Sequence, residues 1–542
     1  MAWRTTSPAV RTAAILFGTL TLSHALAAGG GAPAWLGEVR QAELAIQRED
    51  YVTSAALAAG VLARAESDAR SGPAAELDLA SVLNILGTSQ AGLGRPAQAA
   101  PLLARALDIR RRLLPAPHID LAVSLNNHAG ALLLTGEFDA ARAAAAESVA
   151  MFENLKETSG AEYGLALNNF ATARAELGDY VQAVALYDRA HAVLSAVLPP
   201  AAPRIVRLLI NEGIAVQRTG DLERAAGLFD SALALVRQSA PADPLLLSGA
   251  LNALGDLRIQ QGRPADAERM LTEAYGVAAA LDPPLPLKSG VVEASLARAC
   301  HRRGRLEQAE EHFQSALAAL RTVQSLAPVQ YASAMNNYGL LLLDMRRLAP
   351  AADAFAESKR IFDSKLGPAH PNSIAVVLNL AALAERRHQA GRAAELYQSA
   401  VDLDTAHFGR RHYRVALDLN SLGAFEFRRK HLPQAAKLLR ESRDILRSTW
   451  GPDHPQVALI EANLGLTLWR SKQYDEAEVI MADSIRIQEG LFGPDNPGLV
   501  PLYENYAQLL RDNQHFAASE EAKLRAMRIR VRQALGKTTE TG

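Results

Sequence analysis

A period of 42 residues governs most of this 542-residue chain. Three columns of small residues keep that spacing: glycine or alanine seven places before a repeating anchor, and alanine or serine five and twelve places after it. A repeat of this length cannot bury its apolar face alone, so it predicts a stacked array rather than separate domains. The anchors are Gly94, Gly136, Gly178, Gly220, Gly262, Gly304, Arg346, His388, Lys430, Lys472 and Gln514.

The small columns predict two closely packed helices in each unit. Apolar residues recur between them at helical spacing, as at Leu83 and Leu86 or at Leu251 and Leu254. A small residue on each helix lets the two backbones approach, whereas a larger side chain would overpack the contact. Glycine at the anchor suits the left-handed residue that ends the first helix. The chain is 49% hydrophobic but only 5% aromatic, which also favours close-packed helices over a β-sandwich.

The second helix of several units carries an aromatic residue at one place: Tyr187, Phe229, Phe313, Phe355 and Tyr397. Together with a small residue in each helix and glycine at the turn, this pattern resembles the tetratricopeptide repeat. The longer period, the "GPxHP" links and the "LNN" openings are similar to the kinesin-light-chain type of this repeat. The resemblance implies an all-α, right-handed superhelical solenoid of about twelve helix-turn-helix units.

The repeat positions predict four segments. We expect residues 1–27 to be a signal peptide, 34–66 a divergent first repeat, 67–535 the tandem array and 536–542 a disordered tail. The divergent repeat is indicated by the likeness of "EDYVTSAALAAG" to "GDYVQAVALYDRA", which places Ser54 in an alanine column.

The first residues have the features of an export signal. Arg4 and Arg11 provide the positive charge, residues 13–22 are apolar, and Ala25-Leu26-Ala27 offers a cleavage site before Ala28. We therefore expect an exported protein of a bacterial periplasm or cell envelope. Anchoring by an uncleaved N-terminal segment is the alternative, although the apolar run is shorter than the roughly 20 residues of a membrane span. We expect no membrane span after signal cleavage.

The sequence carries no recognisable catalytic motif. Cys300 is the only cysteine; neighbours on a helix face different directions, so pairing with His301 is disfavoured and a buried, unreactive thiol is the simpler interpretation. Gly536-Lys537-Thr538 imitates the end of a phosphate-binding loop, but Val531 stands where that motif needs glycine. We predict a protein that is not an enzyme and has no cofactor, with an unrecognised enzyme as a remote alternative.

Histidine recurs in the links between units, at His370, His412 and His454, and Asn496 replaces it in the last link. Equivalent positions lie two helices apart, and packed helix axes are about 8–10 Å apart, whereas zinc needs nitrogens at roughly 2.0–2.1 Å. The links therefore predict hinges without a metal site, in which glycine ends one helix and proline opens the next. Asn496 is placed to cap the following helix.

Asparagine recurs nine and ten places before the anchor, in the first helix of nearly every unit. It is a poor residue for a helix interior, but its amide both donates to and accepts from a peptide backbone, and the resemblance to kinesin light chain implies that role on the concave face. The alternative is that one asparagine of each pair bonds the neighbouring helix. The candidates are Asn126, Asn127, Asn168, Asn169, Asn211, Asn252, Asn336, Asn337, Asn379, Asn420, Asn463 and Asn505.

A basic column lies two places before the anchor, with an aromatic residue one place earlier in two units. Facing one groove, these arginines would attract an acidic ligand, and the rings would add stacking or cation–π contacts. The alternative is a solvated helix end, where cations meet the C-terminal end of the helix dipole. The residues are Arg218, Arg302, Arg386, Arg428, Arg470, Phe427 and Trp469.

These features predict an exported, non-catalytic scaffold whose concave groove binds a partner protein or an extended peptide, acidic if the arginines line the groove. A structural or self-assembling envelope array without a peptide ligand is the alternative. The charge balance of 57 Lys and Arg against 58 Asp and Glu gives no reason to expect a nucleic-acid partner.

Overall fold

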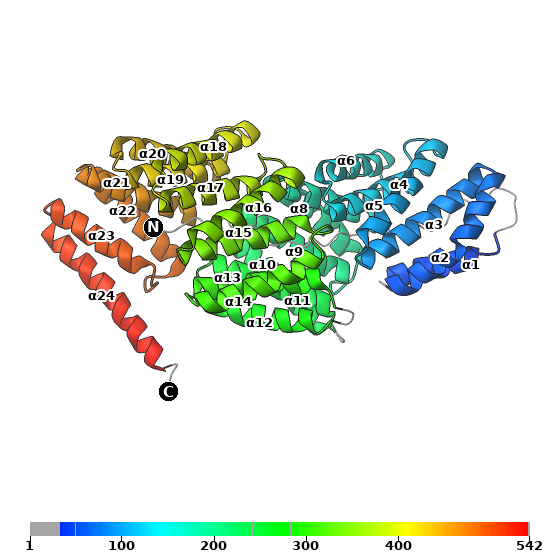
Figure 1. Ribbon diagram of the computed structural model, residues 1–542, viewed down its shortest axis with the longest axis horizontal. Coiled ribbons are helices and arrows are strands. Elements are labelled where there is room, and N and C mark those ends of the chain that lie inside the picture. Colours follow the sequence, from blue (N-terminus) through cyan, green and yellow to red (C-terminus); the bar gives the residue numbers. More distant parts are fainter. Residues whose placement is uncertain (1–32, 49, 240–241, 282–283, 540–542) are drawn as a thin grey trace. The chain divides into compact units, whose positions relative to one another are not determined.

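The chain is an all-α solenoid, as the repeat period predicts (Figure 1). The computed structural model describes backbone for residues 33–48, 50–239, 242–281 and 284–539. Within these ranges it contains twenty-four α-helices, one short 3-10 turn and no strand. Consecutive helices pair, α1 with α2 and so on to α23 with α24. The predicted signal peptide, residues 1–27, lies outside the described residues.

The helices divide between two compact units. The N-terminal unit, described over residues 33–370, contains α1 (Leu36–Gln47), α2 (Tyr51–Asp68), η2 (Ala69–Ser71), α3 (Pro73–Gly92), α4 (Pro96–Leu113), α5 (Ile119–Thr135), α6 (Phe138–Leu155), α7 (Ala161–Glu176), α8 (Tyr180–Val197), α9 (Pro203–Thr219), α10 (Leu222–Gln238), α11 (Pro244–Gln260), α12 (Pro264–Ala279), α13 (Pro286–Arg302), α14 (Leu306–Thr322), α15 (Pro328–Asp344) and α16 (Leu348–Leu366). The C-terminal unit, described over residues 371–539, contains α17 (Pro371–Arg386), α18 (Ala390–Phe408), α19 (Tyr413–Arg428), α20 (Leu432–Trp450), α21 (Pro455–Arg470), α22 (Tyr474–Phe492), α23 (Leu499–Asp512) and α24 (Phe516–Thr539).

All the anchors adopt a left-handed backbone, as predicted for the glycines. The angle φ lies between 71° and 99° at the six anchor glycines, and it is 59° at Arg346 and 65° at Lys430, where glycine is absent. A side chain in this conformation costs roughly 1–2 kcal/mol. Packing of the two helices therefore imposes the turn even where the residue does not favour it.

The paired helices approach each other closely at the small columns. A Cβ atom added to Gly213 in α9 would lie 2.5 Å from Cε1 of Phe229 in α10. One added to Gly255 in α11 would lie 2.6 Å from Cγ of Leu271 in α12. Ala225, in the small column of the second helix, has no exposed surface. The steric role that the sequence predicts for these columns is thus confirmed.

Serine in the second small column adds a hydrogen bond that sequence reasoning missed. The hydroxyl of Ser148 donates to the carbonyl of Ala122 at 2.7 Å, and that of Ser358 donates to the carbonyl of Ala332 at 2.7 Å. In both cases the acceptor lies on the first helix of the same unit. Such a bond contributes about 1 kcal/mol net and joins the two helices of the unit.

The links between units contain helix caps. Nδ1 of His412 accepts a hydrogen bond from the second residue of α19 at 3.3 Å, and Nδ1 of His454 accepts one from the second residue of α21 at 3.2 Å. Oδ1 of Asn496 accepts from the backbone N–H of Gly498 at 2.7 Å, just before α23. Both residue types satisfy N–H groups that the helix itself leaves open.

Helix pairs also occupy the two ends of the described chain. α1 and α2 lie in the segment predicted to be a divergent first repeat, and the buried Ser54 accepts a hydrogen bond from the hydroxyl of Ser89 at 2.8 Å. α24 continues to Thr539, beyond residue 536, where the sequence predicts a tail to begin. Among the helices that the structure describes, none combines the length and the apolar character that crossing a bilayer requires.

Candidate functional site

Asparagines on consecutive first helices bond to each other. Nδ2 of Asn127 in α5 lies 3.1 Å from Oδ1 of Asn84 in α3, and Nδ2 of Asn169 in α7 lies 2.9 Å from Oδ1 of Asn126 in α5. The donor stands nine places before one anchor and the acceptor ten places before the preceding anchor. We call this row the asparagine ladder. Its geometry is the one expected if asparagine bonds the neighbouring helix.

In the N-terminal unit the asparagine ladder is buried. Asn336 and Asn337 of α15 are buried as well, as is Asn379 of α17 in the C-terminal unit, whereas Asn252 of α11 is half-buried. A partner does not reach a buried amide unless the helices move apart. No more than 4% of the surface is exposed at Asn84, Asn126, Asn127, Asn168, Asn169 and Asn211.

In the C-terminal unit, three of the predicted asparagines reach the surface. Nδ2 of Asn463 in α21 donates to Oδ1 of Asn420 in α19 at 3.0 Å, and both side chains are half-buried. Asn505 of α23 is exposed. Apart from the half-buried Asn252 of α11, the candidates that a ligand can contact therefore lie on α19, α21 and α23.

A second ladder joins the ends of first helices, and sequence reasoning missed it. The residue three places before an anchor contacts the residue two places before the next anchor, 43 positions along the chain. Complementary side chains at that spacing were the signal that would have found it. The pairs are Gln217–Gln260 (2.8 Å), His301–Asp344 (3.0 Å), Glu385–Arg428 (2.7 Å) and Trp469–Asp512 (2.8 Å).

Arg428 is part of this second ladder. Its Nε and Nη2 donate to the two carboxylate oxygens of Glu385, each at 2.7 Å, and the hydroxyl of Tyr397 donates to the same carboxylate at 2.7 Å. Burial, reinforced by the charge of Glu385, raises the pKa of Tyr397. A bidentate arginine–carboxylate pair fixes geometry, so Arg428 joins α19 to α17 and is not a freely available ligand-binding cation.

The other arginines of the predicted basic column lie in different environments. Arg218 and Arg302 belong to the N-terminal unit, whereas Arg386 and Arg470 belong to the C-terminal unit. Arg218 and Arg386 are half-buried and Arg302 is exposed, although partial desolvation and the neighbouring Arg298 lower the pKa of Arg302. A solvated stripe would be a uniform row of exposed cations. The arginines of this column differ in exposure, so the column is not such a row.

Arg470 is the exposed arginine of the C-terminal unit's column. Its guanidinium carbon lies 4.8 Å from the centroid of the Trp469 ring, at cation–π distance. Trp469 itself is 8% exposed, and its indole N–H donates to Asp512. Phe427 on α19 is half-buried. The arginine is therefore positioned by a ring that belongs to the core.

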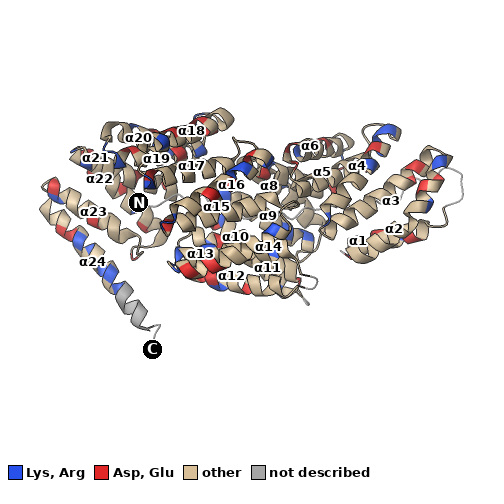
Figure 2. Cartoon of the chain, viewed as in Figure 1, with Lys and Arg blue, Asp and Glu red and all other residues tan. Residues whose placement is uncertain are grey.

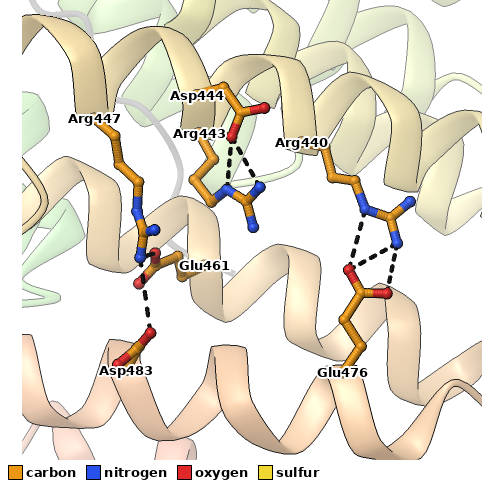
Figure 3. Close-up of polar contacts among 7 residues, drawn as sticks. All are labelled: Arg440, Arg443, Asp444, Arg447, Glu461, Glu476 and Asp483. Atoms are coloured by element: carbon orange, nitrogen blue, oxygen red, sulfur yellow. Dashed lines mark hydrogen bonds and ion pairs between the residues drawn. The ribbon is translucent and has the colours of Figure 1, made fainter.

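Ion pairs neutralise much of the charge on the surrounding helices. Figure 2 shows both signs of charge distributed along the helices, and Figure 3 shows ion pairs made by arginines of α20 in the C-terminal unit. Arg440 of α20 donates to Glu476 of α22 at 2.8 Å, and Arg447 donates to the buried Glu461 of α21 at 2.5 Å (Figure 3). Burial raises the pKa of Glu461, and the charge of Arg447 opposes that rise.

The described residues show no centre of metal or thiol chemistry. Among them there is no group of three or more His, Cys, Asp or Glu side chains that could hold a metal ion. Cys300 is buried, and burial raises the pKa of its thiol, which disfavours the reactive thiolate.

Two protein-family models match segments of this chain. A family model described as tetratricopeptide repeat matches residues 78–154, 162–238, 413–489 and 457–530, and a second model with the same description matches 248–272 and 291–315. The chain belongs to the tetratricopeptide repeat family. Such repeats stack into arrays with extended binding surfaces, and this chain is accordingly a scaffold for protein–protein interaction.

A curated relative supports the kinesin-light-chain type of tetratricopeptide repeat that the sequence predicts. "Protein KINESIN LIGHT CHAIN-RELATED 2" of Arabidopsis thaliana is 27% identical over 110 residues, which are 20% of this chain and 17% of that protein. This chain therefore spans less than a fifth of the relative's length.

Two solved structures are similar to this chain, one over part of its length and one over most of it. BtubC (BKLC) from P. vanneervenii has a TM-score of 0.35 and 22% identity, covering 42% of this chain and 92% of that one. The APC/C hetero-tetramer Cut9–Hcn1 gives a TM-score of 0.43 and 14% identity, covering 92% of this chain and 94% of that one.

Proposed function

We propose that this tetratricopeptide repeat chain is an exported, non-catalytic scaffold whose C-terminal unit binds an extended segment of a partner protein across α19, α21 and α23. The observation that carries the proposal is that Asn420 and Asn463 are only half-buried there and Asn505 is exposed, in contrast to the buried asparagines of α5, α7 and α9. An accessible amide offers a donor and an acceptor to an extended backbone.

The face of α21 suggests the chemistry of the bound segment. Leu459, Asn463, Leu466 and Arg470 follow one another at helical spacing, and all four are half-buried or exposed. The leucines offer apolar contact and Asn463 offers backbone hydrogen bonds, while Arg470 favours a carboxylate. We therefore propose an acidic segment with apolar residues beside its acidic ones.

Binding of two matched peptide series to the full chain tests this proposal. One series is acidic and extended, and in the other each glutamate is replaced by glutamine. We expect the acidic series to bind more tightly at low salt. The difference should shrink as the Debye length falls from about 10 Å at 0.1 M salt to about 3 Å at 1 M. Equal affinities at low salt would contradict the acidic preference.

Arg470→Ala locates the site. Loss of the Arg470 guanidinium should slow association of the acidic peptides, because an exposed charge acts mainly through electrostatic steering of the ligand. Arg392→Ala is the matched control, since Arg392 is also exposed but lies on the second helix α18. An equal effect of the two variants would place binding elsewhere. Asn505→Ala should instead hasten dissociation, because hydrogen bonds are short-ranged.

Export is a separate part of the proposal. It is supported by the charged, apolar and A-x-A features of residues 1–27. Cell fractionation followed by N-terminal sequencing should find the protein outside the cytoplasm, beginning at Ala28. A cytoplasmic protein that begins at Met1 or Ala2 would contradict it. Self-association without peptide binding would favour the alternative of a structural array.

A further inference from the structure

The asparagine ladder is interrupted between α11 and α13. Asn252 of α11 occupies the acceptor place, but Ser295 of α13 stands where the donor asparagine would be. The serine side chain is the shorter one, and neither the buried Oδ1 of Asn252 nor the buried Oγ of Ser295 has a hydrogen-bond partner among the described residues. Buried polar atoms without a partner are uncommon in folded proteins, so this gap in the ladder marks a place where a partner is missing.

The gap leaves the amide of Asn252 able to turn towards a ligand. In α5 and α7 the acceptor asparagines are held by the donor of the next first helix, whereas Asn252 is half-buried and has no such bond. Half a turn about the last side-chain bond exchanges the amide oxygen and nitrogen. Asn252 can therefore offer either an acceptor or a donor to a polypeptide backbone.

One helical turn before Asn252, the surface of α11 is bare. Gly249 shares a face with Asn252, because residues three apart are neighbours on a helix. A Cβ atom added to Gly249 would have Cδ1 of Ile210, at 3.9 Å, as its one close neighbour. The same place carries a side chain in the adjacent first helices, Arg207 in α9 and Val291 in α13. The missing side chain lets a ligand backbone approach α11 closely.

Lys288 of α13 places positive charge beside this bare surface. Its side chain is half-buried, and it makes no hydrogen bond or ion pair with the residues that the structure describes. Burial lowers the pKa of Lys288 to about 8, and the charge of Arg207 on α9 adds to this effect, whereas Asp243 opposes it. The Asp243 carboxylate caps α11, where it accepts from two backbone N–H groups. The interaction with Arg207 indicates that the lysine amine lies on the α11 side of α13.

Elsewhere the array neutralises a cation at the place of Lys288. Arg414 of α19, three units later, pairs with the buried Asp404 of α18 at 3.2 Å. Before Lys288, the place of Asp404 is taken by Ala278. A half-buried cation beside a second cation is unfavourable without a counter-charge. The carboxylate that the C-terminal unit supplies from its own chain is thus absent from this place in the N-terminal unit.

We propose that Gly249 and Asn252 of α11, together with Lys288 of α13, bind an extended acidic segment of a partner polypeptide. Its backbone lies close to α11 at Gly249 and bonds the Asn252 amide, and one of its carboxylates pairs with Lys288. Lys288 is level with residue 246 of α11, about 9 Å along the helix from Asn252. An extended chain spans this distance with about three residues. The site is in the N-terminal unit, so it does not depend on the binding face proposed for α19, α21 and α23.

Chemical labelling of lysine amines in the full chain, measured by mass spectrometry, tests the site. The probe is an extended peptide of alternating glutamate and serine, and the control peptide has glutamine for each glutamate. The glutamate peptide should slow labelling of Lys288 about tenfold, because a carboxylate contact favours the charged amine, which does not react. The glutamine peptide should not slow it. Labelling of Lys437, which is exposed on α20, should be the same with either peptide.

Gly249→Leu tests the bare surface without changing any charge. The leucine side chain would occupy the space over α11 and should remove the protection of Lys288. Thermal unfolding should show a variant at least as stable as the native chain, because leucine favours a helix more than glycine does. Asn252→Ala should weaken the protection as well. Arg470→Ala should leave it unchanged, which separates this site from the one in the C-terminal unit.

Three results would overturn the proposal. The first is labelling of Lys288 that stays unchanged at millimolar glutamate peptide. The second is full protection of Lys288 in Gly249→Leu, because the peptide would then not lie over α11. The third is equal protection by free glutarate, which would show that Lys288 attracts small anions and that the site does not recognise a polypeptide.

Discussion

Lys430 and Gly136 occupy the same place in their units and have the same left-handed backbone, with φ of 65° and 82°. The conformation is natural for glycine but strained for lysine. It persists at Lys430 because the helices on both sides of the turn are held by the small columns. Strain at this residue is therefore offset by packing elsewhere in the unit.

Lys430→Gly should stabilise the C-terminal unit by about 1 kcal/mol, because it removes the backbone strain. The gain is reduced because glycine increases the conformational entropy of the unfolded chain. Urea unfolding followed by tryptophan fluorescence measures this, since Trp450 and Trp469 report on that unit, whereas Trp35 reports on the N-terminal unit. Gly136→Ala should instead lower the free energy of unfolding of the N-terminal unit. A fall in stability for Lys430→Gly would show that the side chain makes contacts worth more than the strain.

Between elements, the contact of Arg447 with Glu461 joins α20 to α21 (Figure 3). Glu461 is 1% exposed, whereas Arg447 is 37% exposed and also lies 3.7 Å from Asp483. Burial raises the pKa of Glu461 above its ordinary value, so the folded protein takes up its proton more readily than the unfolded chain does. The charge of Arg447 and its hydrogen bond oppose this rise.

Arg447→Met should destabilise the C-terminal unit by about 2–3 kcal/mol at neutral pH, because it leaves a buried carboxylate without its partner; the partial exposure of Arg447 keeps the loss below that of a fully buried pair. The folded-state pKa of Glu461 should rise further in the variant. Its stability loss is therefore complete above that pKa and shrinks as the pH falls through it. A loss that is independent of pH, in urea unfolding series, would exclude this cause.

The close approach of paired helices gives a matched test on two glycines. Gly213→Ala places a Cβ atom 2.5 Å from the Phe229 ring and should cost about 1–3 kcal/mol. Gly249→Ala, in the interior of α11, would meet only Cδ1 of Ile210 at 3.9 Å and should stabilise by about 0.5–1 kcal/mol through helix propensity. Thermal unfolding of both variants measures the difference. Equal shifts would mean that the small column is not a steric requirement.

For the whole molecule, the boundary between the two units lies at His370 and Pro371, and each unit is compact by itself. This boundary should limit how far a local disturbance spreads. Stability in a repeat array comes from contacts within repeats and between neighbours. A disturbance within one unit is therefore expected to spread to its neighbouring helices before it reaches distant ones.

Gly465→Val should disturb the C-terminal unit, since even a Cβ atom at this position would lie 2.3 Å from Cγ of Met481. Hydrogen exchange should become faster in α19 to α24, because packing between α21 and α22 is weakened. Exchange in α3 to α6 of the N-terminal unit should stay as in the native protein. Equal acceleration in both units would show that the chain opens as one cooperative body.

Sequence reasoning predicted the features that depend on near neighbours. The 42-residue period, the small columns and the anchor glycines each describe contacts within a unit, and these recur with the same geometry wherever the pattern recurs. The link around His454 was likewise predicted as a hinge, although the imidazole's role as a cap emerged only from its contact with the second residue of α21. Local spacing contains the information for these features.

The tertiary structure decided which repeated residues are accessible. Asn127 and Asn463 stand at the same place in their units, yet the first is buried and the second half-buried. Arg428 and Arg470 share a column, yet one pairs with Glu385 while the other lies over the Trp469 ring. The period is the same in each case, so it cannot distinguish them. Exposure depends on how successive helices pack and on partners 43 residues away, which only the folded chain brings together.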